Sequence, residues 1–303
     1  MTAHEHLRQQ KSGITQVTVG YLVWGLLPMF WKTLDHVGPF EVLLHRIFWC
    51  ALWSSVYFVL RGRRPWLVLR CAWRRSSPLL LVTSAVVVAV NWLSYIYAVT
   101  SGHLLQASLG YFICPILIVL LGVLLFKERM TPLQILALLF CIAGVVYATL
   151  RADGFPWLSV LIGGTFALYG TMKKIIGVDG VTALLSDTVL LTPAVLAAMG
   201  YLYVGGAGEF LTGSTSTNLL LSAAGLATLV PLMLFIQGTI TIPYKTVGFL
   251  QFITPTMAFI LGVWVYREPF SFHQGITFLL ILLGVLSYIL SLIKRPRRGV
   301  PLA

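Results

Sequence analysis

The sequence predicts an all-α membrane protein of ten transmembrane helices, arranged as two inverted repeats of five. Three observations lead to this prediction: an apolar composition, a series of separate apolar segments, and an internal repeat displaced by 140 residues. Of the 303 residues, 58% are hydrophobic and only 10% are charged, whereas soluble domains carry about 25% charged residues. So few charged groups cannot cover a water-soluble globule of this size, which excludes that class of protein.

Apolar runs between clusters of charged and turn-forming residues predict the individual spans. A helix that crosses a bilayer needs about 20 mostly apolar residues. The predicted spans are residues 14–33, 39–60, 77–100, 103–126, 132–150, 156–173, 180–203, 217–238, 244–266 and 272–293. The first span contains Pro28 and Lys32 and is too long for a cleaved signal peptide, so we expect it to be retained.

The distribution of basic residues predicts the orientation. With the N-terminus in the cytoplasm, the inner segments hold 17 lysines and arginines, among them Lys173, Lys174 and Lys245, and the outer segments hold three. The positive-inside rule then predicts that both termini are cytoplasmic. The stretch RGRRPWLVLRCAWRR at residues 61–75 is interpreted as an orienting loop on anionic lipid, so no nucleic-acid partner is expected.

An internal repeat relates the two halves of the chain. Residues 111–145 align without a gap on residues 251–285, with 11 of 35 positions identical, including Pro115 with Pro255 and Gly144 with Gly284. The repeat unit spans five helices, an odd number, so the second copy must insert upside down. We therefore expect a first repeat in residues 1–150 and an inverted one in residues 151–303, an organisation found in secondary transporters with the substrate near the midplane.

Polar residues inside the spans fall into two layers by helix rise. The outer layer is Arg46, Asn91 and Tyr111, and the inner layer is Asp187, Tyr169, Gln251 and a helix break at Pro231. An arginine at this depth is costly unless it meets water, an acid or an anionic ligand. Arg46 therefore either lines a substrate cavity or forms a structural ion pair.

Titratable groups and prolines add further candidates. Asp187, or Glu41 together with His45, is a candidate for proton coupling, although each could be purely structural. Helix breaks are expected at Pro115 and Pro255.

Charged residues at the span ends are expected to pair locally, Glu128 with Lys127 and Glu268 with Arg267. No catalytic or phosphate-binding motif is recognisable in the sequence, so neither an enzyme nor a cofactor is expected. The four cysteines form no CxxC pair, and we expect neither a disulfide nor a metal site.

Several strings resemble a known family: EVLLHRIFW at 41–49, NWLSYIYAV at 91–99, ASLGYFICP at 107–115 and GFLQFITPT at 248–256. They are similar to RarD-type proteins in the EamA branch of the drug/metabolite transporter superfamily. The resemblance implies ten helices in two inverted halves, a bacterial cytoplasmic membrane, and export of small metabolites or drugs. The shared motif positions are Glu41, His45, Arg46, Asn91, Trp92, Ser108, Tyr111, Pro115, Tyr169, Pro231, Gln251 and Pro255. The chain departs from the family pattern at Cys114 and at Lys173–Lys174.

These observations favour a secondary transporter that works by alternating access, with Arg46, Asn91, Trp92, Tyr111, Tyr169 and Gln251 as substrate-binding candidates. An uncoupled facilitator of the same fold is the main alternative. An intramembrane enzyme and a membrane scaffold are weaker ones, because the intramembrane acids do not cluster and a scaffold needs no polar cavity. The expected partners are the lipid bilayer and a small-molecule substrate, and a homodimer is left open.

Overall fold

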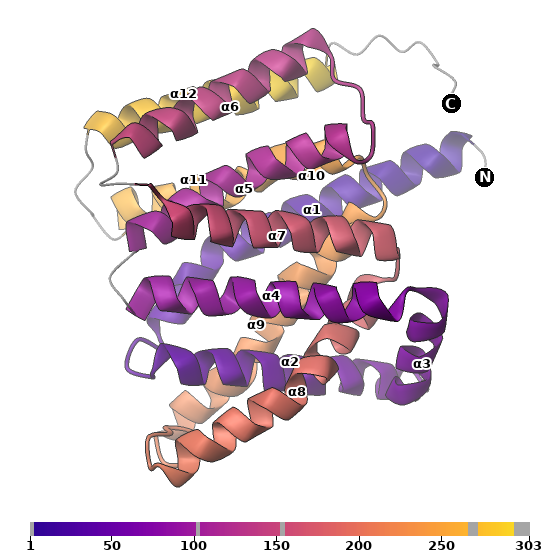
Figure 1. Cartoon of the computed structure of the whole chain (residues 1–303), viewed down its shortest axis with the longest axis vertical. Helices are drawn as coiled ribbons and strands as arrows, with labels where there is room; N and C mark the ends of the chain where they lie inside the picture. The colour runs from indigo at the N-terminus through magenta and orange to yellow at the C-terminus, as the bar shows by residue number, and fades with distance from the viewer. Residues whose placement is uncertain (1–2, 101–103, 152–154, 266–271, 294–303) are drawn as a thin grey trace.

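A computed structural model describes residues 3–100, 104–151, 155–265 and 272–293. The regular structure of these residues is entirely helical (Figure 1). The helices are α1 (Ala3–Lys32), α2 (Pro39–Leu60), α3 (Pro65–Arg75), α4 (Pro78–Thr100), α5 (Leu104–Leu124), α6 (Pro132–Leu150), α7 (Trp157–Ile176), α8 (Gly180–Val204), α9 (Thr215–Thr239), α10 (Tyr244–Gln251), α11 (Ile253–Ile260), a π-helical turn (Leu261–Val265) and α12 (Phe272–Ile293).

Seven helices in the described part of the chain are long and apolar enough to cross a membrane, namely α1, α2, α4, α6, α8, α9 and α12. The other three predicted spans are also helical, as α5, α7 and the interrupted pair α10–α11. Helix α7 contains three glycines and carries two lysines in its last turn, which lowers its hydropathy. The membrane-protein class is therefore confirmed, while the count of ten spans stays a prediction.

Local signals in the sequence explain where many helices begin. Four of them start at a proline, which lacks the amide that a first-turn residue would leave unpaired. Thr131 and Gln134 form a reciprocal capping box before α6, and Asp179 and Ser214 accept first-turn amides of α8 and α9. Each of these caps satisfies a backbone donor in the first turn of its helix.

The segment predicted as an inner loop at residues 61–75 is mostly a helix, which corrects that expectation. In α3, Val68 and Leu69 pack against Phe58, Val181 and Leu185, while the arginines of the helix remain exposed. The Trp73 indole donates to Ser186 Oγ at 3.1 Å. The segment can form a helix because its apolar residues recur at helical spacing, a pattern hidden by its high arginine content.

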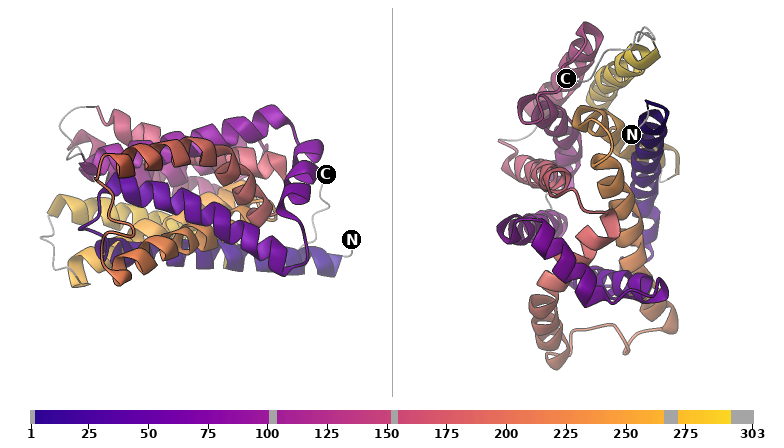
Figure 2. Two further views of the ribbon diagram at one scale, coloured as in Figure 1. Left: turned by 90° about the horizontal axis from the view of Figure 1, so that it is seen from below. Right: turned by 90° about the vertical axis from the view of Figure 1, so that its right-hand side faces the viewer.

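The two halves of the chain pack through equivalent contacts. Helix α7 is the counterpart of α1, α9 that of α4, and α10 with α11 that of α5. Helix α1 packs on α9, α10 and α11, and correspondingly α7 packs on α4 and α5. The pairs α2–α8, α5–α10 and α6–α12 each join corresponding helices of the halves. In Figure 1 and in the right-hand view of Figure 2, α6 and α12 lie side by side at one edge of the molecule.

In the α6–α12 contact, residues that are 140 positions apart in the chain make equivalent contacts. A methyl group added at Gly144 would lie 3.1 Å from the Thr277 carbonyl oxygen, and one added at Gly284 would lie 2.8 Å from that of Ala137. Thr277 and Ala137 are themselves 140 residues apart. Only glycine permits this close approach of two backbones.

The two ends of the bundle carry different segments. The start of α1, the end of α12 and the whole of α3 lie at one end, here called the inner end (Figure 1). The connection between α8 and α9, at residues 205–214, lies at the opposite, outer end. The placement of these segments follows the alternation of helix direction along the chain.

Prolines interrupt the helices less than expected. Helix α5 continues through Pro115, and α9 continues through Pro231, so these two predicted breaks are not breaks in the helix. Near Pro255 the chain does divide, because α10 ends at Gln251 and α11 begins at Ile253. A single proline removes one amide donor, which a helix packed on its neighbours can tolerate without ending.

Candidate substrate-binding site

Arg46 reaches into the space between α1, α2, α4 and α9. Its Nε donates to Thr228 Oγ1 at 3.0 Å. Its Cζ lies 4.7 Å from the centre of the Trp31 ring and 5.8 Å from that of Trp92. Two indoles from different helices therefore contact the guanidinium, which is a favourable setting for a cation.

Arg46 forms no ion pair within the described part of the chain. The acid of its own helix, Glu41, is occupied elsewhere. Its carboxylate accepts the backbone amides of Glu209 and Phe210 at 2.9 and 3.1 Å, and the Tyr203 hydroxyl at 2.8 Å. Glu41 thus anchors the outer 205–214 connection, and the described residues leave the Arg46 charge without an acid beside it.

Tyrosines complete the surroundings of Arg46. The hydroxyls of Tyr95 and Tyr111 are near enough to interact electrostatically with the guanidinium. Their rings lie 6.1 Å apart in an edge-to-face arrangement. Tyr111 is 39% exposed although it lies within α5. The structure therefore brings Arg46 near Trp92 and Tyr111.

Asn91 has a different environment from the rest of the predicted outer layer. Its amide donates to the Ile162 carbonyl at 2.7 Å and to Thr165 Oγ1 at 2.9 Å. The side chain is 7% exposed, and both of its partners belong to α7. In this conformation Asn91 joins α4 to α7, and the neighbouring Trp92 faces Arg46.

His45 lies in a chain of hydrogen bonds toward the outer end. Its Nδ1 accepts from the Trp49 indole at 3.1 Å, and its Nε2 lies 2.8 Å from the Tyr203 hydroxyl, which donates to Glu41. These directions agree only with a neutral imidazole that carries its proton on Nε2. The proton-coupling candidates Glu41 and His45 are thus linked through Tyr203.

Asp187 is fully buried and paired with Lys173, which was counted among the basic residues of the inner segments and ends the predicted span 156–173. The lysine amine lies 2.6 Å from Asp187 Oδ1, and the Tyr169 hydroxyl donates to Oδ2 at 2.9 Å. Ser84 from α4 contacts both members of the pair. The signal for Lys173 was its spacing: it follows Tyr169 by four residues and so shares that residue's helix face.

Gln251, the remaining inner-layer side chain, bonds to residues other than Asp187 and Lys173. Its amide contacts Cys114 Sγ at 3.3 Å, and its carbonyl accepts from the Tyr21 hydroxyl at 3.3 Å. These bonds join α10 to α5 and α1. At Pro231, a methyl added to Gly20 would lie 3.0 Å from the proline carbonyl, so α9 and α1 approach closely there.

Charged residues at the inner end cap helices instead of pairing with neighbours along the chain. Glu128 accepts the amides of Tyr244 and Lys245 at 2.6 and 2.8 Å, so its expected pairing with Lys127 is wrong. Lys174 donates to two carbonyls at the end of α9, and the buried Lys245 donates to the Arg129 carbonyl. Glu268 and Arg267 lie outside the described residues. An unpaired helix end attracts such charges more strongly than an exposed neighbour does.

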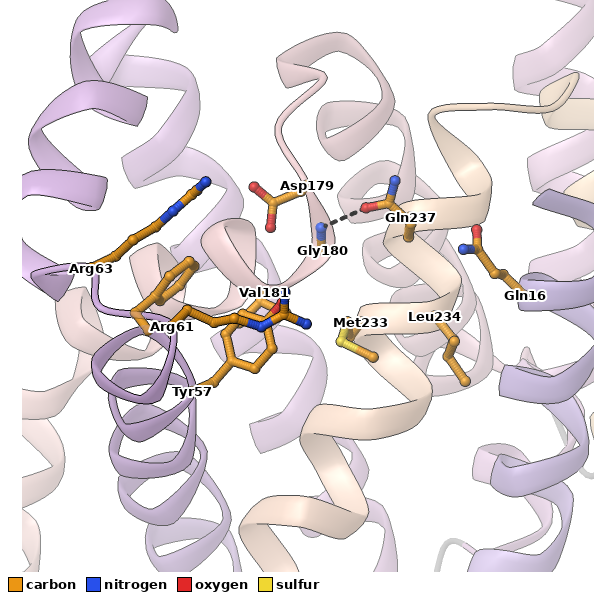
Figure 3. Close-up of a pocket in the computed structure, with 11 residues that line it drawn as sticks. Gln16, Tyr57, Arg61, Arg63, Asp179, Gly180, Val181, Met233, Leu234 and Gln237 are labelled. Carbon is orange, nitrogen blue, oxygen red and sulfur yellow. Dashed lines mark hydrogen bonds between the residues drawn. The ribbon is translucent and has the colours of Figure 1, made fainter. Parts of the chain in front are cut away.

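A cavity of about 490 Å³ opens at the inner end between α1, α2, α8 and α9 (Figure 3). Arg61, Arg63, Gln16, Gln237 and Asp179 supply its polar groups, and apolar side chains of α2, α8 and α9 form the remaining wall. No pattern in the sequence indicates this cavity, because its residues come from four helices that are distant in the chain.

The apolar spans and the charge-bearing interior define a multi-pass helical membrane protein, and the comparisons with known proteins name its family. Residues 11–150 match the EamA-like transporter family. The chain belongs to this family of membrane transporters, within its RarD-type group.

Full-length relatives carry the assignment. The chain is 35% identical to "Uncharacterized transporter YojE" of Bacillus subtilis, covering 95% of this chain and 97% of that protein. It is 31% identical to "Protein RarD" of Escherichia coli, covering 96% and 99%. A solved structure titled "Crystal structure of protein" superposes with a TM-score of 0.67 at 18% identity, covering 93% of this chain and 97% of that one. This last similarity concerns the fold alone.

Proposed function

We propose that this transporter is a secondary exporter of small metabolites or drugs that carry an anionic group, working by alternating access across the bacterial cytoplasmic membrane. The observation that carries the proposal is the position of Arg46 between Trp31, Trp92 and Thr228, with no acid pairing to it in the described residues. A guanidinium with no acid beside it is costly in a membrane interior. A substrate carboxylate or phosphate would supply the missing charge and could accept a bidentate pair of hydrogen bonds.

The proposal includes ten spans in two inverted halves, residues 1–150 and 151–303. The exchange of packing partners between the halves and the matched contacts of Gly144 and Gly284 support it. In such transporters, one repeat rocks against the other around a central site. Helices α5 and α10, which correspond under the repeat and pack together, would then form the centre of the movement.

The proposal also places both termini in the cytoplasm. It is supported by the excess of basic residues in the inner segments and by the position of α3 at the same end as the start of α1. Labelling of variants with one cysteine each tests this orientation. A variant that retains only Cys71 should react from the cytoplasmic side, a cysteine-free variant with a cysteine placed at position 210 should react from the opposite side, and the reverse pattern would overturn the orientation.

Proton coupling is the finer part of the proposal, and the buried Asp187–Lys173 pair is its candidate. Protonation of the carboxylate would neutralise it and release the lysine, which provides two states for a coupled cycle. The Glu41–Tyr203–His45 chain is the second candidate, because it links two titratable groups through one hydroxyl. Substrate accumulation in proteoliposomes under an imposed pH gradient tests coupling, while equilibration without accumulation would identify a facilitator.

Ligand stabilisation tests the substrate site directly. Purified protein is screened against amino acids, nucleobases, organic phosphates and antibiotics, with the melting temperature as the readout. We expect an anionic compound to raise the melting temperature of the wild type and not that of Arg46→Gln. The exposed Arg8→Gln is the control for loss of one positive charge. Equal stabilisation of wild type and Arg46→Gln by every hit would contradict an anion site at Arg46.

A further inference from the structure

The inner cavity has a polar rim whose two arginines are held by a defined turn. At the end of α2, the Arg63 amide donates to the Phe58 carbonyl at 2.8 Å and the Gly62 amide to the Val59 carbonyl at 2.9 Å. With Gly62 at φ +67°, these bonds form a Schellman motif. The turn therefore presents Arg61 and Arg63, the residues on either side of the glycine, at the same rim (Figure 3).

The arginine side chains are available to a ligand. Arg61 lies over the Tyr57 ring at 5.4 Å and extends toward Met233 (Figure 3). Neither Arg61 nor Arg63 forms an ion pair in the described part of the chain. The one acid at the cavity, Asp179, caps α8 through both of its oxygens, which bind Thr182. Two arginines and one aspartate leave a single net positive charge, which suits a monoanion such as a phosphodiester.

The opposite part of the wall is apolar. Phe58 and Val181 are buried there, and Met233 and Leu234 complete the surface. An ion that is soluble in water gains little from such a wall, whereas an amphiphile gains from both parts. The ligand that fits this cavity therefore has a phosphate group attached to an apolar body.

Helix α3 indicates where that ligand comes from. It follows the arginine turn directly, and it packs on Phe58 and Val181, which also line the cavity. Its outer surface exposes Trp66 at 54%, together with arginines. Tryptophan and arginine together are typical of a helix that lies at the level of lipid headgroups. The cavity opening and the headgroup layer are thus at the same end of the bundle.

We propose that this cavity binds the phosphodiester headgroup of an anionic phospholipid of the inner leaflet, with Arg61 and Arg63 as the phosphate ligands and the Phe58–Val181–Met233 wall against the lipid's glycerol and first methylene groups. Basic pockets between membrane helices on the cytoplasmic side are suited to such headgroups. The Gln16 and Gln237 amides at the rim can bond the hydroxyls of a glycerol headgroup. This site is separate from Arg46, and it does not depend on what the protein transports.

Lipid titration of purified protein in detergent tests the site. Native mass spectrometry and the melting temperature are followed while phosphatidylglycerol or phosphatidylcholine is added. We expect phosphatidylglycerol to bind the wild type and raise its melting temperature more than phosphatidylcholine does. The dissociation constant of phosphatidylglycerol should be on the order of tenfold higher in Arg61→Gln/Arg63→Gln than in Arg74→Gln/Arg75→Gln, because charge-assisted bonds are lost only in the first variant. Both variants remove the same charge from the same end of the molecule.

Three results would overturn the proposal. The first is equal stabilisation of the wild type by the two lipids. The second is an equal loss in both double variants, which would reduce the effect to general surface charge. The third is full replacement of phosphatidylglycerol by glycerol 3-phosphate, which would show a site for a soluble phosphate ester instead. Arg61→Lys/Arg63→Lys preserves the charge and serves as the folded reference, with binding between those of the wild type and the glutamine variant.

Discussion

Two cations in the interior of this bundle have opposite surroundings. Lys173 is completely buried and meets an acid at 2.6 Å, and the same acid accepts hydrogen bonds from Tyr169 and Ser84. Arg46 is partly exposed and meets two indoles and a threonine hydroxyl. The charge of Lys173 is already neutralised by Asp187, whereas the charge of Arg46 can still pair with an anionic ligand. Burial of a charged residue in a membrane therefore does not by itself identify a binding site, and its partners must be known.

The largest expected effect concerns the complete pair. Lys173→Met or Asp187→Asn should each lower stability by about 3–5 kcal/mol, because one member of a buried pair is left alone. Replacement of both, in Lys173→Met/Asp187→Leu, should recover most of the loss. Thermal unfolding of purified protein in one detergent measures all three variants. Single variants as stable as the wild type would show that the pair is not closed to water as the structure has it.

The double variant also separates stability from coupling. If Asp187 carries the proton, Lys173→Met/Asp187→Leu should fold, let substrate equilibrate, and fail to accumulate it under a pH gradient. Accumulation at the wild-type level would move proton coupling from Asp187 to Glu41 and His45.

The second effect concerns Arg46 and should leave stability nearly unchanged. Arg46→Gln loses cation–π contacts of about 0.5–2 kcal/mol but also removes an unpaired charge from the interior. We expect a shift in stability below about 1 kcal/mol together with loss of transport. Arg46→Lys should transport at an intermediate rate, because it retains the charge and loses the planar fork. A drop in stability as large as that of Asp187→Asn would mean that Arg46 is a structural cation like Lys173.

The third effect concerns Glu128, whose replacement should change stability by less than that of Asp187 and by more than that of Arg46. Glu128 forms no ion pair among the described residues, but it receives two backbone amides at the start of α10. Glu128→Gln should cost about 1–2 kcal/mol, as expected for a weakened helix cap. The exposed Glu209→Gln is the matched control, with an expected change near zero. Thermal unfolding measures both, and equal effects in the two variants would contradict the capping role.

The smallest effect concerns the indoles around Arg46. Trp31 lies closer to the guanidinium than Trp92, at 4.7 against 5.8 Å. Trp31→Leu should weaken binding of an anionic ligand about two- to fivefold, and Trp92→Leu less, because each ring orients the guanidinium through a cation–π contact. Ligand titration followed by melting temperature measures both. The reverse order of the two effects would show that the rings contact the ligand instead of orienting the arginine.

Much of the helical arrangement could be predicted from the sequence. Apolar runs of bilayer length located the helices, because the backbone in lipid must satisfy its own hydrogen bonds. Repeated glycine and proline positions indicated two related halves before any packing was known. The prediction missed α3, because its arginines conceal an apolar face that becomes evident only against α2 and α8.

The candidate site was less predictable. Depth counts placed Arg46 and Tyr111 at a similar level, and the structure brings them near each other. The same counts could not separate Asn91, which bonds to α7, from Trp92, which faces Arg46. Depth along one helix says how far a residue lies from the surface, but not which neighbouring helix its side chain meets.

The sequence by itself determined the class of protein, the approximate span limits and the candidate polar residues, because hydropathy, charge bias and repeat spacing act along one chain. Only the tertiary structure decided which charges are paired. Lys173 is separated from Asp187 by a turn between two helices, and Arg46 meets residues of α1, α4 and α9. The inner cavity likewise exists only where the ends of four helices converge. Such neighbours are determined by how helix surfaces fit together, and a linear pattern of residues does not contain that information.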